Sequence, residues 1–300
     1  MRGAKTEMGS EATTAATLYV VATPIGNLGD VTLRALEVLR AVPLIAAEDT
    51  RHTRRLLERH GVSTRTTSYH AQSDAARTRA LLDHLRNGAD LALVTDAGTP
   101  AVSDPGGELV GAWAAEGGIV VPIPGASAVL AAVAGSGAAG PRWAFEGFLP
   151  RSGRERHERI GRIAADDRGT ILFEAPGRVA ATLEDLAAAC GADRPGAVCR
   201  ELTKLHETIV RGTLGELAEA ARAGRIPARG EFALVVGGWP GGRPVSAEAA
   251  LDAVEAARGE VDRLTAAGTA RGEAARRVSA ATGIPRRQLY GSTAPDRIRP

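Results

Sequence analysis

The segment at residues 91–107, LALVTDAGTPAVSDPGG, constrains the fold of this 300-residue chain more than any other. Its first four residues are apolar and partly β-branched, which is typical of a buried strand, and a loop rich in Asp, Gly, Thr and Pro follows. Open α/β sheets bind ligands beyond the carboxyl ends of such strands. Asp104 before Pro105 predicts a helix N-cap, with the helix continuing over residues 108–118. We therefore expect a binding loop in which Asp96 and Asp104 bracket a turn, although two ordinary turns would give the same pattern.

The same order of strand, polar loop and helix recurs in the first half of the chain. Helices are expected at residues 31–42, capped by Asp30, at 75–86 and at 128–134, and residues 68–70 are expected to be a short link. This alternation predicts a mostly parallel sheet that is covered on both faces. The strands are expected at residues 18–22, 43–47, 91–94 and 119–123.

One glycine motif is misleading. Residues 135–140, GSGAAG, match the dinucleotide fingerprint G-x-G-x-x-G, but they follow a predicted helix and precede Pro141. The fingerprint needs a strand before it and a helix after it. We interpret these residues as a helix stop and a domain hinge, which argues against an NAD-dependent oxidoreductase.

The second half of the chain alternates less strictly and predicts a mixed sheet, followed by a linker at 237–244 and a small helical appendage at 247–290. A chain of this length is expected to form about two domains. The expected strands are at residues 143–147, 170–173, 196–200, 208–211 and 232–236. The expected divisions are a disordered tail at 1–17, an N-terminal α/β domain at 18–141, a second α/β domain at 142–240, and the linker with its appendage at 241–300.

Charge is balanced overall but uneven locally. The 37 basic and 35 acidic residues leave a net charge of +2, so the chain as a whole is not a polycation. Arginine-rich runs at residues 51–65 and 151–168 suit either phosphate binding or a solvated surface. Lys5 and Lys204 are the only lysines in the sequence, and Lys204 is notable because an amine can shift its pKa whereas a guanidinium cannot.

Cysteine content and hydropathy argue against several protein classes. Cys190 and Cys199 have no second pair and no histidine at ligand spacing, which argues against a zinc site and a disulfide framework. The first 17 residues lack an apolar signal region, and the chain has no long apolar span. We expect a cytoplasmic protein with no bound metal and no membrane association.

Taken in order, eight motifs resemble the ribosomal RNA small-subunit methyltransferase I family of the tetrapyrrole methylase superfamily. The match covers about residues 18–237, and residues 268–290 resemble that family's helical appendage. The motifs are LYVVATPIGNLGDVTLRALEVL, AAEDTRHTRRLL, SYH, ALVTDAGTPAVSDPGG, PIPGASA, FEGFLP, FEAPGR and RELTKLHE.

The resemblance implies a two-domain tetrapyrrole-methylase-like α/β fold with S-adenosylmethionine between the domains. It implies methyl transfer to the ribose 2'-hydroxyl of a cytidine in 16S ribosomal RNA, with that RNA or the small ribosomal subunit as partner, and a homodimer. The chain departs from the family at EAPGR, residues 174–178, where Ala175 and Gly177 replace a usual Ser and His. Thr95 and Ala126 likewise replace a usual Ser and Pro. A mechanism that needs an imidazole at position 177 is therefore excluded.

Resemblance to superfamily members also implies which residues surround the cofactor, although turn or core packing would explain each of them taken singly. These are Pro24, Ile25, Asp96, Gly98, Thr99, Ser127, Ala128, Phe173, Glu174 and Leu202.

A ribose hydroxyl needs a base to take its proton. Lys204, Glu201 and Asp49 are candidate catalytic residues, with His70 as a further possibility, and the sequence does not choose among them. Lys204 would need a lowered pKa to act in this way, and it could instead contact phosphate. Exposed arginines and an aromatic surface would bind unpaired RNA. The RNA-binding candidates are Arg51, Arg54, Arg55, Tyr69, Arg151 and Arg154.

Two other functions remain open. A methylase acting on a porphyrin-like macrocycle would be expected to have an open apolar binding groove and a sequence without arginine-rich runs. A catalytically silent RNA-binding assembly factor would keep salt-dependent RNA affinity without binding the cofactor.

Overall fold

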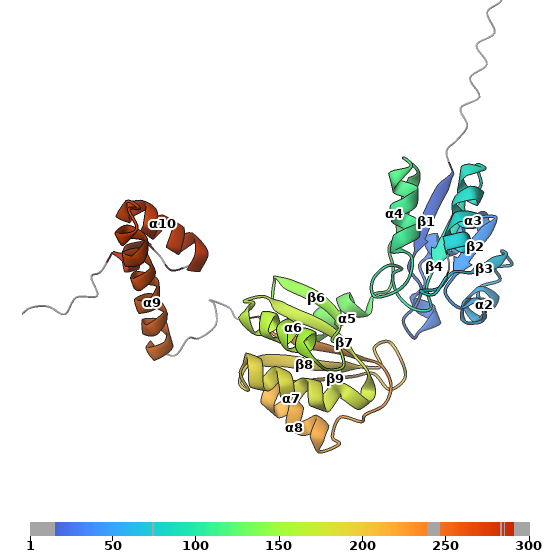
Figure 1. Ribbon diagram of the computed structural model, residues 1–300. Coiled ribbons are helices and arrows are strands. Elements are labelled where there is room, and N and C mark those ends of the chain that lie inside the picture. The colour runs from blue at the N-terminus through green and yellow to red at the C-terminus, as the bar shows by residue number, and fades with distance from the viewer. Residues whose placement is uncertain (1–15, 74, 239–246, 283, 285, 291–300) are drawn as a thin grey trace, which may run out of the picture. The chain divides into compact units, whose positions relative to one another are not determined.

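The computed structural model describes residues 16–73, 75–238, 247–282, 284 and 286–290, and the side chains of residues 247–253 are not described (Figure 1). The chain separates into two compact units, Met1–Pro240 and Gly241–Pro300, which we describe separately. Thr17, the last residue of the expected tail, already belongs to the first strand. The rest of that tail, most of the expected linker and the residues after Gly291 lie outside the described residues, apart from Ala16 and the first two linker residues.

The first sheet has five strands in the order β3-β2-β4-β1-β5, and every pair is parallel, which confirms the predicted parallel sheet. Residues 68–70 were wrongly expected to be only a link, because Ser68 ends an edge strand that pairs with β2. That strand has three polar residues, too few to show a strand pattern. The strands are β1 (Thr17–Val21), β2 (Leu44–Ala47), β3 (Thr66–Ser68), β4 (Leu91–Val94) and β5 (Ile119–Ile123).

Helices cover both faces of the first sheet. Successive residues of β4 point to opposite sides, so Ala92 and Val94 pack with α1 and α2, whereas Leu91 and Leu93 pack with α3 and α4. This explains why all four residues of the strand are apolar. The helical elements are η1 (Leu28–Asp30), α1 (Leu33–Ala41), α2 (Thr50–Arg59), α3 (Ala75–Arg86), α4 (Gly107–Ala115) and α5 (Ala128–Ser136).

Neither aspartate expected to cap a helix does so. Thr32 caps α1 by accepting a hydrogen bond from the Ala35 N–H, and Asp30 lies in the preceding 3-10 turn. Helix α4 begins after Gly106, which has φ 127° and no side-chain cap. A Cβ at Gly106 would lie 2.7 Å from Leu93 Cδ2, so this close approach to the sheet requires glycine. Asp104 therefore stays in the loop and is free for another role.

The second sheet has the order β6-β7-β10-β8-β9, and it is mixed, as predicted. β6 and β7 run parallel, and β10 is antiparallel to both of its neighbours. The strands are β6 (Trp143–Phe148), β7 (Gly169–Glu174), β8 (Pro195–Arg200), β9 (Thr208–Thr213) and β10 (Phe232–Val236). The helical elements are α6 (Arg154–Ala165), η2 (Pro176–Arg178), α7 (Val179–Cys190) and α8 (Leu214–Arg222).

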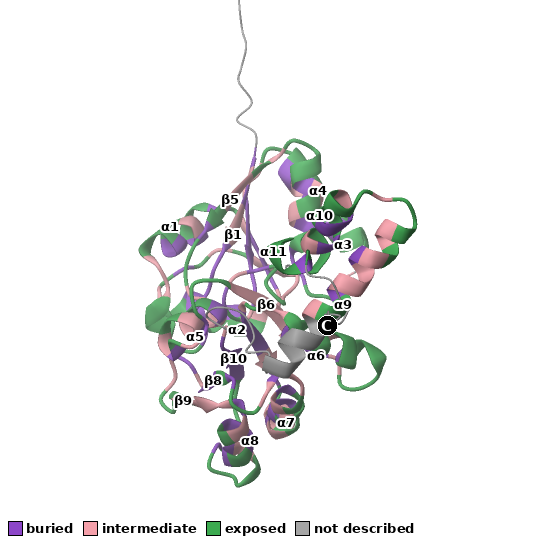
Figure 2. Ribbon diagram, turned by 90° about the vertical axis from the view of Figure 1, so that its left-hand side faces the viewer, coloured by how far each residue is buried: buried purple, intermediate pink, exposed green. Residues whose placement is uncertain are grey.

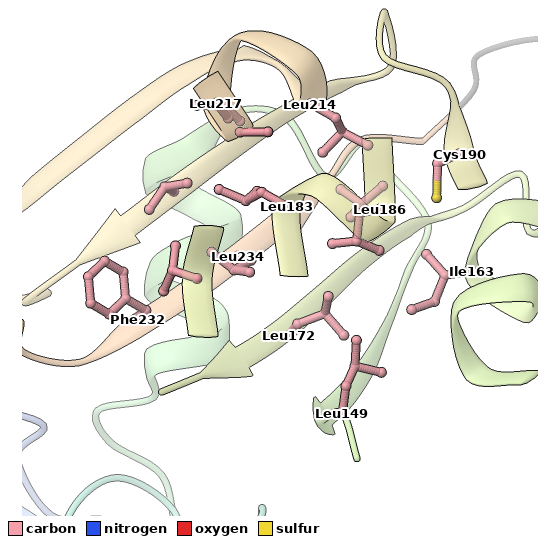
Figure 3. Close-up of a cluster of buried hydrophobic side chains, with 14 of the residues drawn as sticks. Leu149, Ile163, Leu172, Leu183, Leu186, Cys190, Leu214, Leu217, Phe232 and Leu234 are labelled. Carbon is pink, nitrogen blue, oxygen red and sulfur yellow. The ribbon is translucent and has the colours of Figure 1, made fainter. Parts of the chain in front are cut away.

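The two faces of the second sheet are covered differently. Figure 3 shows Leu172 and Leu234 of the sheet facing Leu183 and Leu186 of α7, within the core that α6, α7 and α8 cover. The other face packs against α5, which follows the last strand of the first sheet. Figure 2 shows the central strand β10 as buried, whereas the edge strand β9 is mostly of intermediate exposure. The domain boundary expected at residues 141 and 142 stays a prediction.

Helix α5 ends within the GSGAAG segment. Its C-cap is Gly137, with φ 65° in the left-handed region that favours glycine. The segment therefore acts as the predicted helix stop.

Arg194 is fully buried in the second sheet's layer. Its Nε donates to the Gly237 carbonyl at 2.8 Å, and its Nη1 donates to the Ile163 carbonyl at 3.2 Å. Nη2 donates to the carbonyls of Asp166 and Arg168, each at 3.1 Å. One guanidinium thus holds together the end of α6, the start of β7 and the end of β10.

The second unit is helical, which confirms the predicted appendage. Its helices are α9 (Ala247–Ala266), α10 (Arg271–Thr282) and α11 (Arg286–Leu289). Val261, Val278 and Leu289 form its core together with small alanines. No helix among the described residues is long and apolar enough to cross a membrane.

Candidate functional site

A cavity of about 420 Å³ is lined by the loops that follow β1, β4 and β5 and by residues of the second sheet. Its volume is within the range typical of small-molecule sites. The first sheet contributes Ile25, residues 97–99, 102–104 and 127–129, and the second sheet contributes 148, 173–176, 199, 202 and 230–233. The carboxyl ends of parallel strands thus form one side of the cavity, as the loop pattern predicts.

Backbone pairing fixes the loops after β1 and β4 against each other. The Thr23 N–H donates to the Gly98 carbonyl at 2.8 Å, and the Gly98 N–H donates to the Thr23 carbonyl at 3.0 Å. Gly98 has φ 75°, and a Cβ there would lie 3.4 Å from Ile25 Cγ2 on the cavity wall. Glycine suits this position both by backbone conformation and by proximity to the cavity.

The rest of the loop after β4 is conformationally strained. Ala101 and Ser103 have φ values of 68° and 65°, in the left-handed region that non-glycine residues rarely adopt. Such residues cost of order 1–3 kcal/mol each and cluster at functional sites. Here they turn Val102, Ser103 and Asp104 onto the cavity wall.

Glu174 anchors the opposite wall. It is 3% exposed and accepts hydrogen bonds from the Ala175 N–H at 2.8 Å and the Thr182 hydroxyl at 2.7 Å. Its Oε1 also lies 3.2 Å from Arg178 Nε. Within EAPGR, the two charged residues therefore fix the wall, whereas a Cβ at Gly177 would meet nothing within 4 Å. The missing imidazole leaves no packing defect in this loop.

Most of the expected cofactor residues line the cavity, and two do not. Asp96 accepts a hydrogen bond from the Asp49 N–H at 3.1 Å, so its carboxylate ties the loop after β2 to the loop after β4. Pro24 is buried next to the wall without lining the cavity. The expected residues that do line it are Ile25, Gly98, Thr99, Ser127, Ala128, Phe173, Glu174 and Leu202.

Asp104 is a carboxyl group of the cavity wall whose pKa is raised. Partial burial, together with the negative charges of Glu48 and Asp96, raises its pKa from 3.8 to about 6, and the Thr95 hydroxyl acts in the opposite direction. The Asp96 N–H donates to Glu48 Oε2 at 3.2 Å, which keeps these acidic groups close together. Among the described residues, Asp104 has no cation at ion-pair distance.

Lys204 is not placed to act as a base. Its Nζ lies 2.9 Å from Glu201 Oε1 and 2.7 Å from Glu231 Oε2. Burial lowers its pKa, but the hydrogen bonds to Glu231 and Glu201 outweigh burial, so the pKa is raised and the amine stays protonated. Its stem packs on the loop after β1, because a Cβ at Gly26 would lie 2.5 Å from Lys204 Cγ. Lys204 therefore holds together the loops that carry Gly26, Glu201 and Glu231.

Glu201 and Asp49 are weaker bases than ordinary carboxylates. The hydrogen bond from Lys204 lowers the pKa of Glu201, and the hydrogen bond from the Arg51 side chain lowers that of Asp49. Asp49 caps α2 by accepting the Arg51 N–H at 2.8 Å. His70 is exposed, and none of these side chains lines the cavity.

Residues 17–218 match the family model for Tetrapyrrole (Corrin/Porphyrin) Methylases. A protein from Synechocystis named ribosomal RNA small subunit methyltransferase I is 48% identical over 91% of this chain and 95% of its own length. Proteins of the same name from Micromonospora olivasterospora and Xylella fastidiosa are 45% and 41% identical, covering 91% and 93% of this chain and 85% and 99% of their own lengths.

The chain belongs to the ribosomal RNA small subunit methyltransferase I family.

Solved structures of more distant relatives share the fold of this family member. A cobalt precorrin-4 methyltransferase superposes with a TM-score of 0.57 at 21% identity, covering 76% of this chain and 96% of its own. Uroporphyrin-III C-methyltransferase from Thermus thermophilus, solved with S-adenosyl homocysteine, gives 0.53 at 21% identity and covers 74% and 97%. These likenesses confirm the predicted tetrapyrrole-methylase-like fold.

The two arginine runs differ in their surroundings. Arg51, Arg54 and Arg55 are exposed on α2, where Arg51 also pairs with Asp49 at 3.2 Å. Arg151 and Arg154 are likewise exposed, and Arg154 pairs with Glu158.

Part of the second run is structural. Arg156 is 7% exposed and bonds Asp185 and Thr182, and Arg159 pairs with Glu146. Among the described residues of that run, only the exposed arginines are therefore available to bind phosphate.

Tyr69 does not offer the stacking surface expected of it. The residue is 4% exposed and packs with Leu81 and Leu82 of α3, and its hydroxyl lies 3.5 Å from that of Thr78. Tyr69 directly follows the edge strand β3, and helix α3 packs over its ring and shields it from solvent.

Phe148 is an exposed aromatic residue that the sequence did not single out. It is 52% exposed, lines the cavity, and has its ring centroid 5.7 Å from that of Phe173. A register shift between Phe145 and Gly147 bends β6 just before it, as bulges beside binding sites do. The sequence feature that could have identified Phe148 is its position as an aromatic residue at the end of a predicted strand, within FEGFLP.

No group of three or more His, Cys, Asp or Glu side chains within the described residues is placed to hold a metal ion.

Proposed function

We propose that this protein transfers a methyl group from S-adenosylmethionine to the ribose 2'-hydroxyl of a cytidine in 16S ribosomal RNA. The observation that carries the proposal is identity of 41–48% over about nine-tenths of the chain with proteins named ribosomal RNA small subunit methyltransferase I. The cavity supports it, since it combines apolar walls with a few polar groups.

The residues present fit S-adenosylmethionine. Ile25, Val102, Phe173 and Leu202 give apolar surface for an adenine ring, and the N–H groups and hydroxyls near Ser127 and Thr99 suit the amino-acid end. Gly98 lets the backbone approach a bound molecule closely. When bound, the sulfonium supplies an electrophilic methyl group.

The contribution of the protein itself is positioning. The paired loops at Thr23 and Gly98 and the anchored Glu174 wall hold the cavity in one shape. Alignment of an attacking oxygen with a methyl group at roughly 3–3.5 Å accounts for much of the catalysis in such displacements.

The function is tested with labelled S-adenosylmethionine, using small ribosomal subunits and naked 16S RNA from a strain that lacks this protein. We expect label in 2'-O-methylcytidine after nucleoside analysis, in one or both substrates. Absence of label from both substrates, with cofactor binding intact, would reject the RNA assignment and favour a small-molecule methylase. Salt-dependent RNA binding without cofactor binding would indicate an assembly factor.

Exposed arginines on α2 are proposed to contact the RNA backbone. We expect the double change Arg54→Gln and Arg55→Gln to weaken RNA binding and to reduce the slope of log affinity against log salt by about 1.4, since each lost phosphate contact removes about 0.7. The matched control is Arg222→Gln with Arg225→Gln, at the last residue of α8 and just beyond it, where Arg225 pairs with Glu219. Helix α8 covers the sheet face opposite the cavity. Equal slopes for the two double variants would remove α2 from the interface.

A homodimer in the cytoplasm is proposed from the resemblance alone. Sedimentation of the purified protein at twice the monomer mass is the expected result.

A further inference from the structure

We propose that the carboxylate of Asp104 is the base that accepts the proton of the ribose hydroxyl. The inference rests on the proposed function, since it assigns a catalytic residue to that same cavity.

The position of Asp104 suits the role. It is half-buried, lines the cavity, and follows Val102 and Ser103 on the strained loop after β4. A Cβ at Gly147 would lie 3.2 Å from Ser103 Oγ, so the end of β6 directly approaches this loop. Asp104 therefore lies on the part of the wall where the first sheet's loop meets the strand that ends in Phe148.

The other carboxylates near the cavity are already engaged. Glu174 is held by Arg178, Thr182 and the following N–H group. Glu231 and Glu201 share the Lys204 ammonium, and the hydrogen bond from Lys204 lowers the pKa of Glu201. Among the described residues that line the cavity, this leaves Asp104 as the carboxylate without an ion-pair partner.

The surroundings of Asp104 make it more basic than an ordinary aspartate. Glu48, just after β2, and Asp96, just after β4, act on it with negative charge, and the hydrogen bond from the Thr95 hydroxyl acts in the opposite direction. Burial and these charges raise its pKa to about 6, so it is ionised at pH 7.5 and still a useful proton acceptor. This differs from Glu201 and Asp49, whose pKa values are lowered.

The step balances in atoms and charge. Asp104 takes the hydroxyl proton while the oxygen–methyl bond forms and the bond between methyl and sulfur breaks. The carboxylate becomes a neutral acid, and the cationic donor leaves as a neutral thioether.

The first test is the rate of methyl transfer by Asp104→Asn across pH 5 to 9. We expect about a 100-fold lower rate at pH 7.5, since general-base catalysis typically contributes 100-fold or more. The wild-type rate should rise tenfold per pH unit below about pH 6 and then level off, and the variant should lose this limb. Glu108→Gln is the matched control, because it makes the same chemical change on an exposed residue of α4 outside the cavity.

The second test needs neither cofactor nor RNA. Carbon NMR of labelled aspartate carboxyl groups should show one signal that titrates near pH 6 and is missing from Asp104→Asn. Glu48→Gln removes a negative charge beside Asp104, so the same signal, and the acid limb of the rate, should move to lower pH. A structural role would not produce this coupled shift.

The outcomes separate the two proposals. A wild-type protein that binds the cofactor but methylates no RNA overturns the proposed function. An active wild type with an equally active Asp104→Asn variant, or an Asp104 signal that titrates near pH 4, overturns the assignment of the base alone.

Discussion

Replacement of Gly98 by leucine is expected to lower the affinity for S-adenosylmethionine about 1000-fold, which corresponds to about 4 kcal/mol. The new side chain would start 3.4 Å from Ile25 Cγ2 and 3.8 Å from the Ala126 carbonyl, and it would extend along the cavity wall. A ligand that uses this wall would lose both its contact with the backbone and its space. Isothermal titration calorimetry measures the affinity directly.

Gly88→Leu is the control for this variant. Gly88 has φ 81°, close to the 75° of Gly98, but a Cβ there would meet nothing within 4 Å. Both variants therefore carry a similar backbone penalty of about 1 kcal/mol, and only one of them changes the cavity. If Gly98→Leu bound the cofactor as tightly as Gly88→Leu, the cavity would not be the cofactor site.

Arg194→Met is expected to lower the free energy of unfolding by about 3–5 kcal/mol, because breaking a buried charged network leaves its partners unsatisfied. The guanidinium is fully buried and donates to four backbone carbonyls, those of Gly237, Ile163, Asp166 and Arg168. Methionine fills similar space but donates no hydrogen bond. Urea unfolding followed by circular dichroism at pH 7 measures the difference.

Arg142→Met makes the same change at the surface of the same sheet. Arg142 pairs with Asp167 at 3.1 Å, and its side chain is 68% exposed. An exposed ion pair of this kind contributes at most about 1 kcal/mol. A loss below 1 kcal/mol for Arg194→Met would show that water or a rearranged loop satisfies the four carbonyls.

Much of the fold was predictable from local sequence. The apolar runs at β4 and β10 correspond to strands that are buried along their whole length, and the polar loops after β1, β4 and β5 line the cavity. The failures have local causes too. The edge strand β3 is too short and polar to show a strand pattern. Helix α8 was not predicted, although Thr213 and Glu216 form a capping box at its N-terminus.

The roles of the site residues were less predictable. Lys204 and Glu201 lie three residues apart, yet the second partner of Lys204 is Glu231, which the chain brings to it from 27 residues away. Tyr69 was expected at a binding surface and is buried under α3, while the exposed aromatic residue at the cavity is Phe148. Exposure of a single aromatic ring depends on which helix covers it, and periodicity carries no such information.

The sequence by itself determined most of the order of strands, loops and helices, the family, and the loops that carry the site, because these follow from patterns between residues close together in the chain. Only the tertiary structure decided which carboxylate faces the cavity and which one holds a loop. Asp96 and Asp104 lie on the same loop and look equivalent in the sequence. One accepts the Asp49 N–H, and the other is half-buried near Glu48 and, within the part of the chain that the structure describes, has no cation at ion-pair distance. The basicity of a carboxyl group depends on burial and on charges a few ångströms away, and the folded chain supplies both from distant segments.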